Sequence, residues 1–163
     1  MQHIMKKAIV AGLFISLVST LTSCQKNAER KPAKFEPQRV QAQAENRIAR
    51  CNTVHTLTLP ATVLDRYGIA AGDDTAVLSC SLQVATEPPT NIPARVSAEI
   101  QSLSGPSEPL NFKEILDQGA VSYVAPFSIA GRLKINFSIQ IIDPQSDQRF
   151  ELHLTQAALP GRK

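Results

Sequence analysis

The 163-residue sequence has few of the residues from which common catalytic and stacking sites are built. It contains no tryptophan and only two tyrosines, so an aromatic platform for stacking sugars or bases is poorly supplied. None of its seven glycines forms a glycine-rich loop that could cradle phosphate groups. Its three cysteines contain no CxxC pair, which disfavours a thiol redox centre or a zinc site. The sequence therefore offers no pattern typical of nucleotide-dependent, redox or zinc enzymes.

The charge balance argues against a nucleic-acid-binding protein. The formal net charge is +3, and Lys6 and Lys7 near the N-terminus supply two of these charges. Residues 25–50 carry seven basic and three acidic residues, whereas residues 51–163 carry eight basic and eleven acidic residues. A nucleic-acid-binding domain needs a concentrated basic face. We therefore expect no nucleic-acid partner.

The N-terminal segment is typical of an export signal. Lys6 and Lys7 precede an apolar run over residues 8–18, as in secretory signals. This run is shorter than the roughly 20 residues that a membrane-spanning helix needs. The run is followed by Leu21-Thr22-Ser23-Cys24. An ordinary secretory signal with a coincidental cysteine is the alternative.

These four residues resemble the bacterial lipoprotein box, in which the signal is cleaved before a cysteine that is then acylated. The resemblance implies a signal peptide over residues 1–23, lipidation of Cys24 and the lipid bilayer as a partner. Several acyl chains would hold the protein stably at a membrane. Gln25, rather than aspartate, follows the cysteine, which by the same resemblance implies the periplasmic face of the outer membrane.

The remaining two cysteines form an even pair. If Cys24 is acylated, Cys51 and Cys80 are left in an oxidising compartment, where disulfides are common. We expect a Cys51–Cys80 disulfide that closes a loop of about 30 residues and stabilises the fold by roughly 3.5 kcal/mol. Two free, buried thiols are the alternative.

Residues 24–50 are predicted to be the lipidated cysteine and a basic, flexible linker, because glutamine, lysine, arginine and proline dominate and apolar residues are few. A solvated spacer is the simplest interpretation, and its basic charge could also rest on anionic head groups. The i, i+4, i+8 spacing of Val40, Ala44 and Ile48 leaves a short helix over residues 37–50 as an alternative.

From Cys51 onward apolar residues alternate with polar ones, which predicts strands. Pro60 to Tyr67 breaks this alternation with helical spacing, and Gly68 provides a stop signal. The pattern predicts an all-β domain over residues 51–163: an antiparallel, Ig-like two-sheet sandwich of about seven strands, with one short helix after the first strand. A partly closed barrel is the alternative. The expected strands are 53–59, 75–85, 94–103, 110–116, 120–129, 133–141 and 149–155.

The order of these elements resembles a proteobacterial family of small exported proteins known only as a domain of unknown function. The resemblance covers about residues 54–155, and it implies an envelope location and a β-rich fold but no substrate. The family's pattern has an asparagine where this chain has Ser79, and it lacks the two cysteines of the domain. The residues that carry the resemblance are Leu59-Pro60, Leu64, Tyr67-Gly68-Ile69 and Leu78-Ser79-Cys80-Ser81-Leu82 in one half, and Leu110-Asn111-Phe112, Glu114-Ile115, Ala120, Tyr123-Val124, Phe127, Leu133 and Phe137 in the other.

Candidate chemistry is sparse. His55 and His153 lie in the first and last predicted strands, and two distant histidines are too few for a zinc site. A hydrolase would need one of them beside an acid and a nucleophile. We expect no catalytic residue, no metal and no cofactor, and we expect a non-enzymatic binding or interaction module that recognises an unknown envelope protein or ligand. The alternative is a small-ligand or glycan binder with a pocket near the short helix, beside Tyr67.

Overall fold

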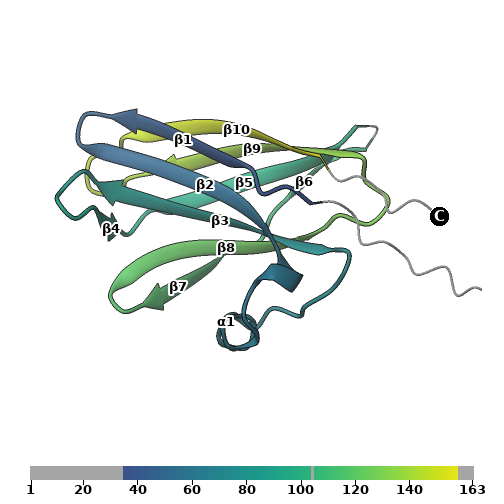
Figure 1. Ribbon diagram of the computed structural model, residues 1–163. Coiled ribbons are helices and arrows are strands. Elements are labelled where there is room, and N and C mark those ends of the chain that lie inside the picture. Colours follow the sequence, from purple (N-terminus) through teal and green to yellow (C-terminus); the bar gives the residue numbers. More distant parts are fainter. Residues whose placement is uncertain (1–34, 104, 158–163) are drawn as a thin grey trace, which may run out of the picture.

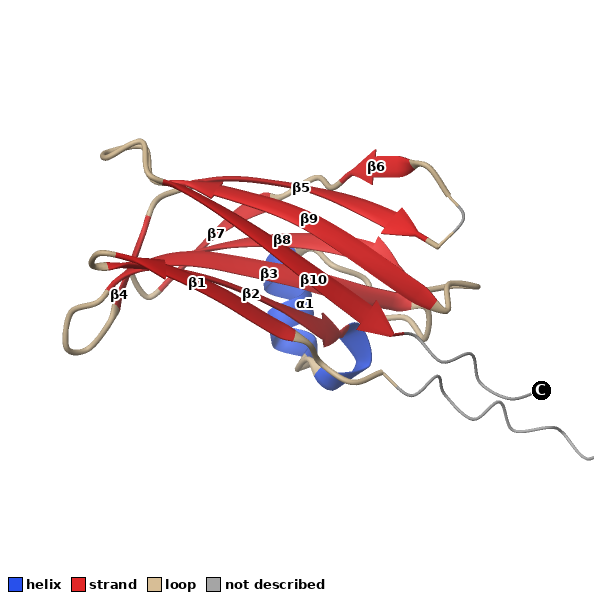
Figure 2. Cartoon of the chain, turned by 90° about the horizontal axis from the view of Figure 1, so that it is seen from above, coloured by secondary structure: helices blue, strands red, loops and turns tan. Residues whose placement is uncertain are grey.

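The computed structural model describes residues 35–103 and 105–157. Within them the chain forms two antiparallel sheets packed face to face (Figures 1 and 2). This confirms the predicted all-β sandwich, and the two sheets do not join into the alternative barrel. The predicted signal peptide and Cys24 lie outside the described residues. No helix among the described residues is long and apolar enough to cross a membrane.

The larger sheet has the order β1-β2-β3-β8-β7, and the short strand β4 also pairs with β3. The smaller sheet has the order β10-β9-β5-β6. The strands are β1 (Arg39–Ala44), β2 (Arg47–His55), β3 (Thr75–Val84), β4 (Thr90–Ile92), β5 (Arg95–Ser102), β6 (Ser107–Pro109), β7 (Lys113–Asp117), β8 (Ala120–Ser128), β9 (Lys134–Ile142) and β10 (Arg149–Ala157).

The predicted linker is wrong for its second half. Residues 39–44 form β1, and β2 begins at Arg47, so the domain starts before Cys51 and no helix forms over residues 37–50. Val40, Ala42 and Ala44 pack on the core from β1, and the turn to β2 contains Glu45 with a φ of 51°. Their spacing of two fits a strand, but the two alanines are small and the polar residues between them gave the segment the composition of a linker. The first predicted strand is likewise displaced, because residues 56–58 form a 3-10 turn.

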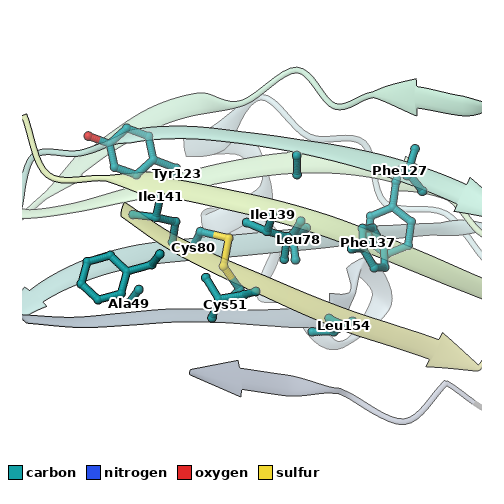
Figure 3. Close-up of a cluster of buried hydrophobic side chains, with 14 of the residues drawn as sticks. Ala49, Cys51, Leu78, Cys80, Tyr123, Phe127, Phe137, Ile139, Ile141 and Leu154 are labelled. Carbon is teal, nitrogen blue, oxygen red and sulfur yellow. A yellow bond between two sulfur atoms is a disulfide. The ribbon is translucent and has the colours of Figure 1, made fainter. Parts of the chain in front are cut away.

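The core fills the space between the sheets. It consists of the inward-facing residues of both sheets, as the alternation predicts. Phe127 of β8 and Phe137 of β9 meet edge to face across it, with ring centroids 5.0 Å apart (Figure 3). Its largest fully buried apolar side chains are Phe137, Leu78, Leu82, Ile135, Ile141 and Leu152.

The disulfide predicted from the cysteine count is present and lies within this core (Figure 3). Cys51 of β2 and Cys80 of β3 are direct cross-strand partners, and both are buried. Alternation explains the pairing, because both cysteines occupy inward-facing positions of neighbouring strands. The bridge therefore joins two central strands of the larger sheet.

A buried polar network fixes the chain where it enters β1. The Gln38 backbone N–H donates to the Thr53 hydroxyl at 3.0 Å, and that hydroxyl donates to Gln156 Oε1 at 2.6 Å. Gln156 Nε2 in turn donates to the Glu36 carbonyl at 3.1 Å. These bonds connect residues 36–38 to β2 and β10, one from each sheet. They hold the start of β1, and with it Arg39, in place.

Candidate functional site

The helix predicted after the first strand is present as α1 (Ala61–Tyr67), although it follows the second strand of the sandwich. Gly68 ends it in the left-handed conformation, with a φ of 65° that favours glycine. The segment packs on the outer face of the larger sheet, below β3, β7 and β8 in Figure 1. There Leu59, Tyr67 and Ile69 cover a small apolar cluster of Val77, Ile115 and Val124.

The α1 segment covers only part of this outer face. Further along β2 and β3 the face is open and hollowed, with a cavity of about 560 Å³. We call this hollow the sheet groove. It is lined by Arg39, Val40 and Gln41 of β1, Arg50, Cys51 and Asn52 of β2, Ser79 and Ser81 of β3, Asn91 of β4 and Ser122 of β8.

Strand register explains why polar side chains meet there. Arg39 opposes Asn52, and Asn52 opposes Ser79 on the next strand. In the adjacent row Gln41 opposes Arg50, which opposes Ser81. Directly opposed residues in antiparallel strands point to the same face. The two rows therefore place six polar side chains side by side on the outer face, and the two arginines are diagonal neighbours.

The charged side chains that line the groove, Arg39 and Arg50, are both basic. Within residues 35–103 and 105–157, no aspartate or glutamate lines the groove. None of the ion pairs between described residues involves Arg39 or Arg50. This contrasts with Arg47, which is bound to the buried carboxylate of Asp143 at 2.8 Å. The groove thus contains two guanidinium groups that have no counter-ion among the described residues.

An unsatisfied acceptor lies beside the groove. Gln83 Nε2 donates to Asn91 Oδ1 at 2.8 Å, and Asn91 Nδ2 donates to the Val121 carbonyl at 2.9 Å. Among the buried side-chain nitrogen and oxygen atoms of the described residues, Gln83 Oε1 is the one without a hydrogen-bond partner. Gln83 shares the outer face of β3 with Ser79 and Ser81, because all three alternate with core residues. A buried acceptor of this kind gains from any donor that reaches it.

A second hollow, of about 460 Å³, lies on the outer face of the smaller sheet. It brings His153 together with Glu99, Glu151 and Ser138, and Ser138 is the direct cross-strand partner of both Glu99 and His153. No hydrogen bond joins His153 to Ser138 or to either glutamate among the described residues. Glu99 instead accepts from the Ser107 hydroxyl at 2.7 Å. The arrangement lacks the hydrogen-bonded relay that a serine nucleophile needs.

His55, the other sequence candidate, is buried and bonded to backbone. Its Nδ1 accepts from the Leu57 N–H at 3.2 Å, so Nε2 is the donor toward the Asp73 carbonyl at 3.0 Å. The ring of Phe35 packs edge-on against it. Both ring nitrogens therefore make hydrogen bonds to the backbone, as expected for a lone histidine in a strand. Among the described residues no group of three or more histidine, cysteine, aspartate or glutamate side chains is placed to hold a metal ion.

The pocket expected beside Tyr67 takes a different form. Tyr67 is packed into the apolar cluster under α1 and lines neither hollow. The sheet groove lies on the same outer face, but its lining is mostly polar. Sequence reasoning missed it because it depends on the register of five strands. The one available signal was the run of small, uncharged polar residues at the outward positions of β3, where a solvated strand usually carries lysine or glutamate.

The fold and the groove define an antiparallel β-sandwich with a polar hollow on one sheet. The chain belongs to the family described as a domain of unknown function, DUF4426, whose model matches residues 27–159. No curated protein matches the sequence.

Three solved structures are similar in fold. One is a DUF4426 family protein from Pseudomonas aeruginosa, with 17% identity and a TM-score of 0.64 over 76% of this chain and 97% of that chain. Another is a copper-bound variant of FetP from uropathogenic Escherichia coli strain F11, with 11% identity and a TM-score of 0.50 over 79% and 99% of the two chains. A third is FetP from the same strain, expressed in the periplasm, with 12% identity and a TM-score of 0.51 over 80% and 99%. At these identities the similarity shows the fold alone.

Proposed function

We propose that this protein is a lipid-anchored binding module of the bacterial cell envelope, that it is not an enzyme, and that it takes its ligand in the sheet groove. The observation that carries this proposal is the groove itself. Its lining offers hydrogen-bond donors, hydroxyls and two guanidinium groups. In the part of the chain that the structure describes, it includes no histidine, no carboxylate and no free thiol, since Cys51 is disulfide-bonded. Such a set binds polar molecules and supplies no nucleophile–base pair.

Three observations support the envelope location. The sequence Leu21-Thr22-Ser23-Cys24 resembles a lipoprotein box. The Cys51–Cys80 disulfide suits an oxidising compartment. One of the structurally similar FetP proteins was expressed in the periplasm. The outer membrane, facing the periplasm, is the proposed site of anchoring because Gln25 follows the cysteine.

The linker between Cys24 and the domain is shorter than the sequence predicted. With β1 beginning at Arg39 and Phe35 already packed against the core, ten residues, 25–34, separate Cys24 from the domain. Fully extended, they reach about 35 Å. The module therefore works close to the bilayer, and an envelope protein partner would have to meet it there.

The copper named for the FetP variant is not part of this proposal. His55 is buried and committed to backbone, and His153 lies on the outer face of the smaller sheet. These two histidines do not converge on one site. A protein partner is the second candidate function, and the exposed Leu116 of the edge strand β7 favours it, because 70% of this residue is accessible.

Palmitate labelling of cells that express the full-length chain tests the anchor. We expect the wild-type protein to incorporate labelled palmitate and to sediment with membranes. Cys24→Ala should lose both properties, whereas the double variant Cys51→Ala/Cys80→Ala should keep the label. Label retained by Cys24→Ala, or absent from the wild type, would refute the lipid anchor.

A further inference from the structure

We propose that the sheet groove is an anion site: Arg39 and Arg50 together clamp a carboxylate or phosphate group carried on a small, hydroxyl-rich molecule. This inference rests on the proposed binding function and names the class of ligand. It requires no metal and no chemical step.

The two arginines are placed to act on one group. Arg39 opposes Asn52, two residues from Arg50, so Arg39 and Arg50 are diagonal neighbours on adjacent strands. Diagonal neighbours in an antiparallel pair have Cα atoms about 7–8 Å apart, within the reach of long side chains. Both line the same hollow. A guanidinium group binds a carboxylate or phosphate through two parallel N–H···O bonds, so two of them can saturate one oxyanion.

The negative charge of the surrounding domain favours a small anion over an extended one. Residues 35–157 contain nine lysines and arginines against thirteen aspartates and glutamates, a net charge of −4. The groove is positive although the body around it is negative. Long-range repulsion disfavours an extended polyanion or an anionic membrane face, whereas a small anion inside the hollow interacts mainly with the two nearest charges.

The other lining groups suit the body of the ligand. The hydroxyls of Ser79, Ser81 and Ser122 can donate or accept, and the amide of Asn52 can do both. No aromatic side chain of the described residues lines the groove, so the affinity comes from the charged clamp and from hydrogen bonds rather than from stacking. A volume of about 560 Å³ is within the usual range for small-molecule sites.

The hollow on the other sheet gives an internal contrast. Glu99 and Glu151 line it, and no arginine or lysine among the described residues does. Anions should therefore select the sheet groove over the second hollow.

Isothermal titration calorimetry tests the clamp, with glucose 6-phosphate, glucuronate and uncharged glucose as probes. The protein is the full-length chain purified in detergent, together with its Cys24→Ala variant. We expect saturable binding of at least one of the two anionic sugars at millimolar concentrations or tighter, and none of glucose. The two anions separate a phosphate preference from a carboxylate preference. Binding should weaken as salt is added, because both arginines are exposed.

Substitutions of the two arginines then test whether the anion binds between them. Arg39→Gln and Arg50→Gln should each weaken binding by about tenfold or more, equivalent to about 1.4 kcal/mol. Arg50→Lys keeps the charge but loses the fork, so it should recover only part of the loss. Lys134→Gln is the matched control, because it removes one positive charge from the outer face of the smaller sheet and should bind as the wild type does. Unchanged far-UV circular dichroism and melting temperatures would show that the variants are folded.

Two results would overturn the anion site: no saturable heat with either anionic sugar, or binding that Arg39→Gln and Arg50→Gln both leave unchanged. Equal binding of glucose and glucuronate would also contradict the clamp. Because the Cys24→Ala variant carries the same groove, its binding does not depend on the anchor. A failed palmitate experiment and a failed titration are therefore separate outcomes.

Discussion

The buried ion pair between Arg47 and Asp143 allows a sharp test of how the two sheets are held together. Arg47 begins β2 in the larger sheet, and Asp143 directly follows β9 in the smaller one. The Asp143 side chain has no exposed surface, and it accepts hydrogen bonds from Arg47 Nε at 2.8 Å, the Gln145 N–H at 2.8 Å and the Ser146 hydroxyl at 2.9 Å. Asp143→Ala removes all three acceptor contacts at once.

The expected loss follows from what remains after the substitution. Breaking a buried pair by removing one partner costs about 3–5 kcal/mol, because the other charge stays desolvated. The Arg47 side chain retains 16% exposure, so water can partly replace the lost carboxylate. We therefore expect the free energy of unfolding to fall by about 3 kcal/mol, at the lower end of that range. Urea unfolding followed by circular dichroism measures this change.

Asp147 is a matched control in the same turn. It is 69% exposed, and its contacts with Arg95 and Arg149 are 3.5 and 3.9 Å long. Exposed pairs of this kind contribute little, so Asp147→Asn, which keeps a residue suited to the left-handed φ of 55° at this position, should change the stability by no more than about 0.5 kcal/mol. If Asp143→Ala costs less than about 1 kcal/mol, or no more than Asp147→Asn, the argument that this pair joins the sheets is wrong.

Two further predictions concern the pH and the disulfide. Burial raises the pKa of the Asp143 carboxyl, but the hydrogen bonds from Arg47, Gln145 and Ser146 lower it by more, so the pKa lies below 3.8 in the folded protein. The stabilisation by the ionised carboxylate is therefore complete above the pKa of Asp143 in the unfolded state, and it is lost as the pH falls through the pKa in the folded state. In this acid range we expect the free energy of unfolding to depend less on pH in Asp143→Asn than in the wild type. The same pH dependence in both proteins would contradict this expectation. Replacing both Cys51 and Cys80 by alanine should lower the free energy of unfolding by about 3.5 kcal/mol, because the bridge spans 29 residues. Thermal unfolding with and without reductant checks this, since only the wild type should respond to the reductant.

Local sequence pattern was enough to predict most of the sandwich. Ile135, Phe137, Ile139 and Ile141 alternate with polar residues in β9, and all four are buried. The same logic located the short helix, because Gly68 provides the left-handed C-cap that the pattern required. For the strands and the helix the signal lay within one segment of the chain. The disulfide was predicted from the cysteine count, because Cys51 and Cys80 are the even pair left once Cys24 is assigned to the anchor.

The elements that were missed depend on neighbours. The strands β4 and β6 have three residues each, too few to show alternation. The strand β1 pairs with β2 along its whole length, and its outward face is Arg39, Gln41 and Gln43, which alone resembles a solvated linker. Pairing across strands decided these outcomes, and no single segment contains that information.

The missed strand also changes where the positive charge of the protein lies. Composition assigned the basic residues of 25–50 to a tether whose charge could rest on lipid head groups. Three of its seven basic residues are instead fixed in the sandwich: Arg47 neutralises Asp143, while Arg39 and Arg50 line the sheet groove. A mobile charge and a fixed pair differ in what they can recognise, because only the fixed pair presents a defined geometry to one oxyanion. Residues 25–34 still carry four basic residues against one acidic residue, so most of the excess charge stays outside the sandwich, and the groove holds only the two arginines that have a defined geometry.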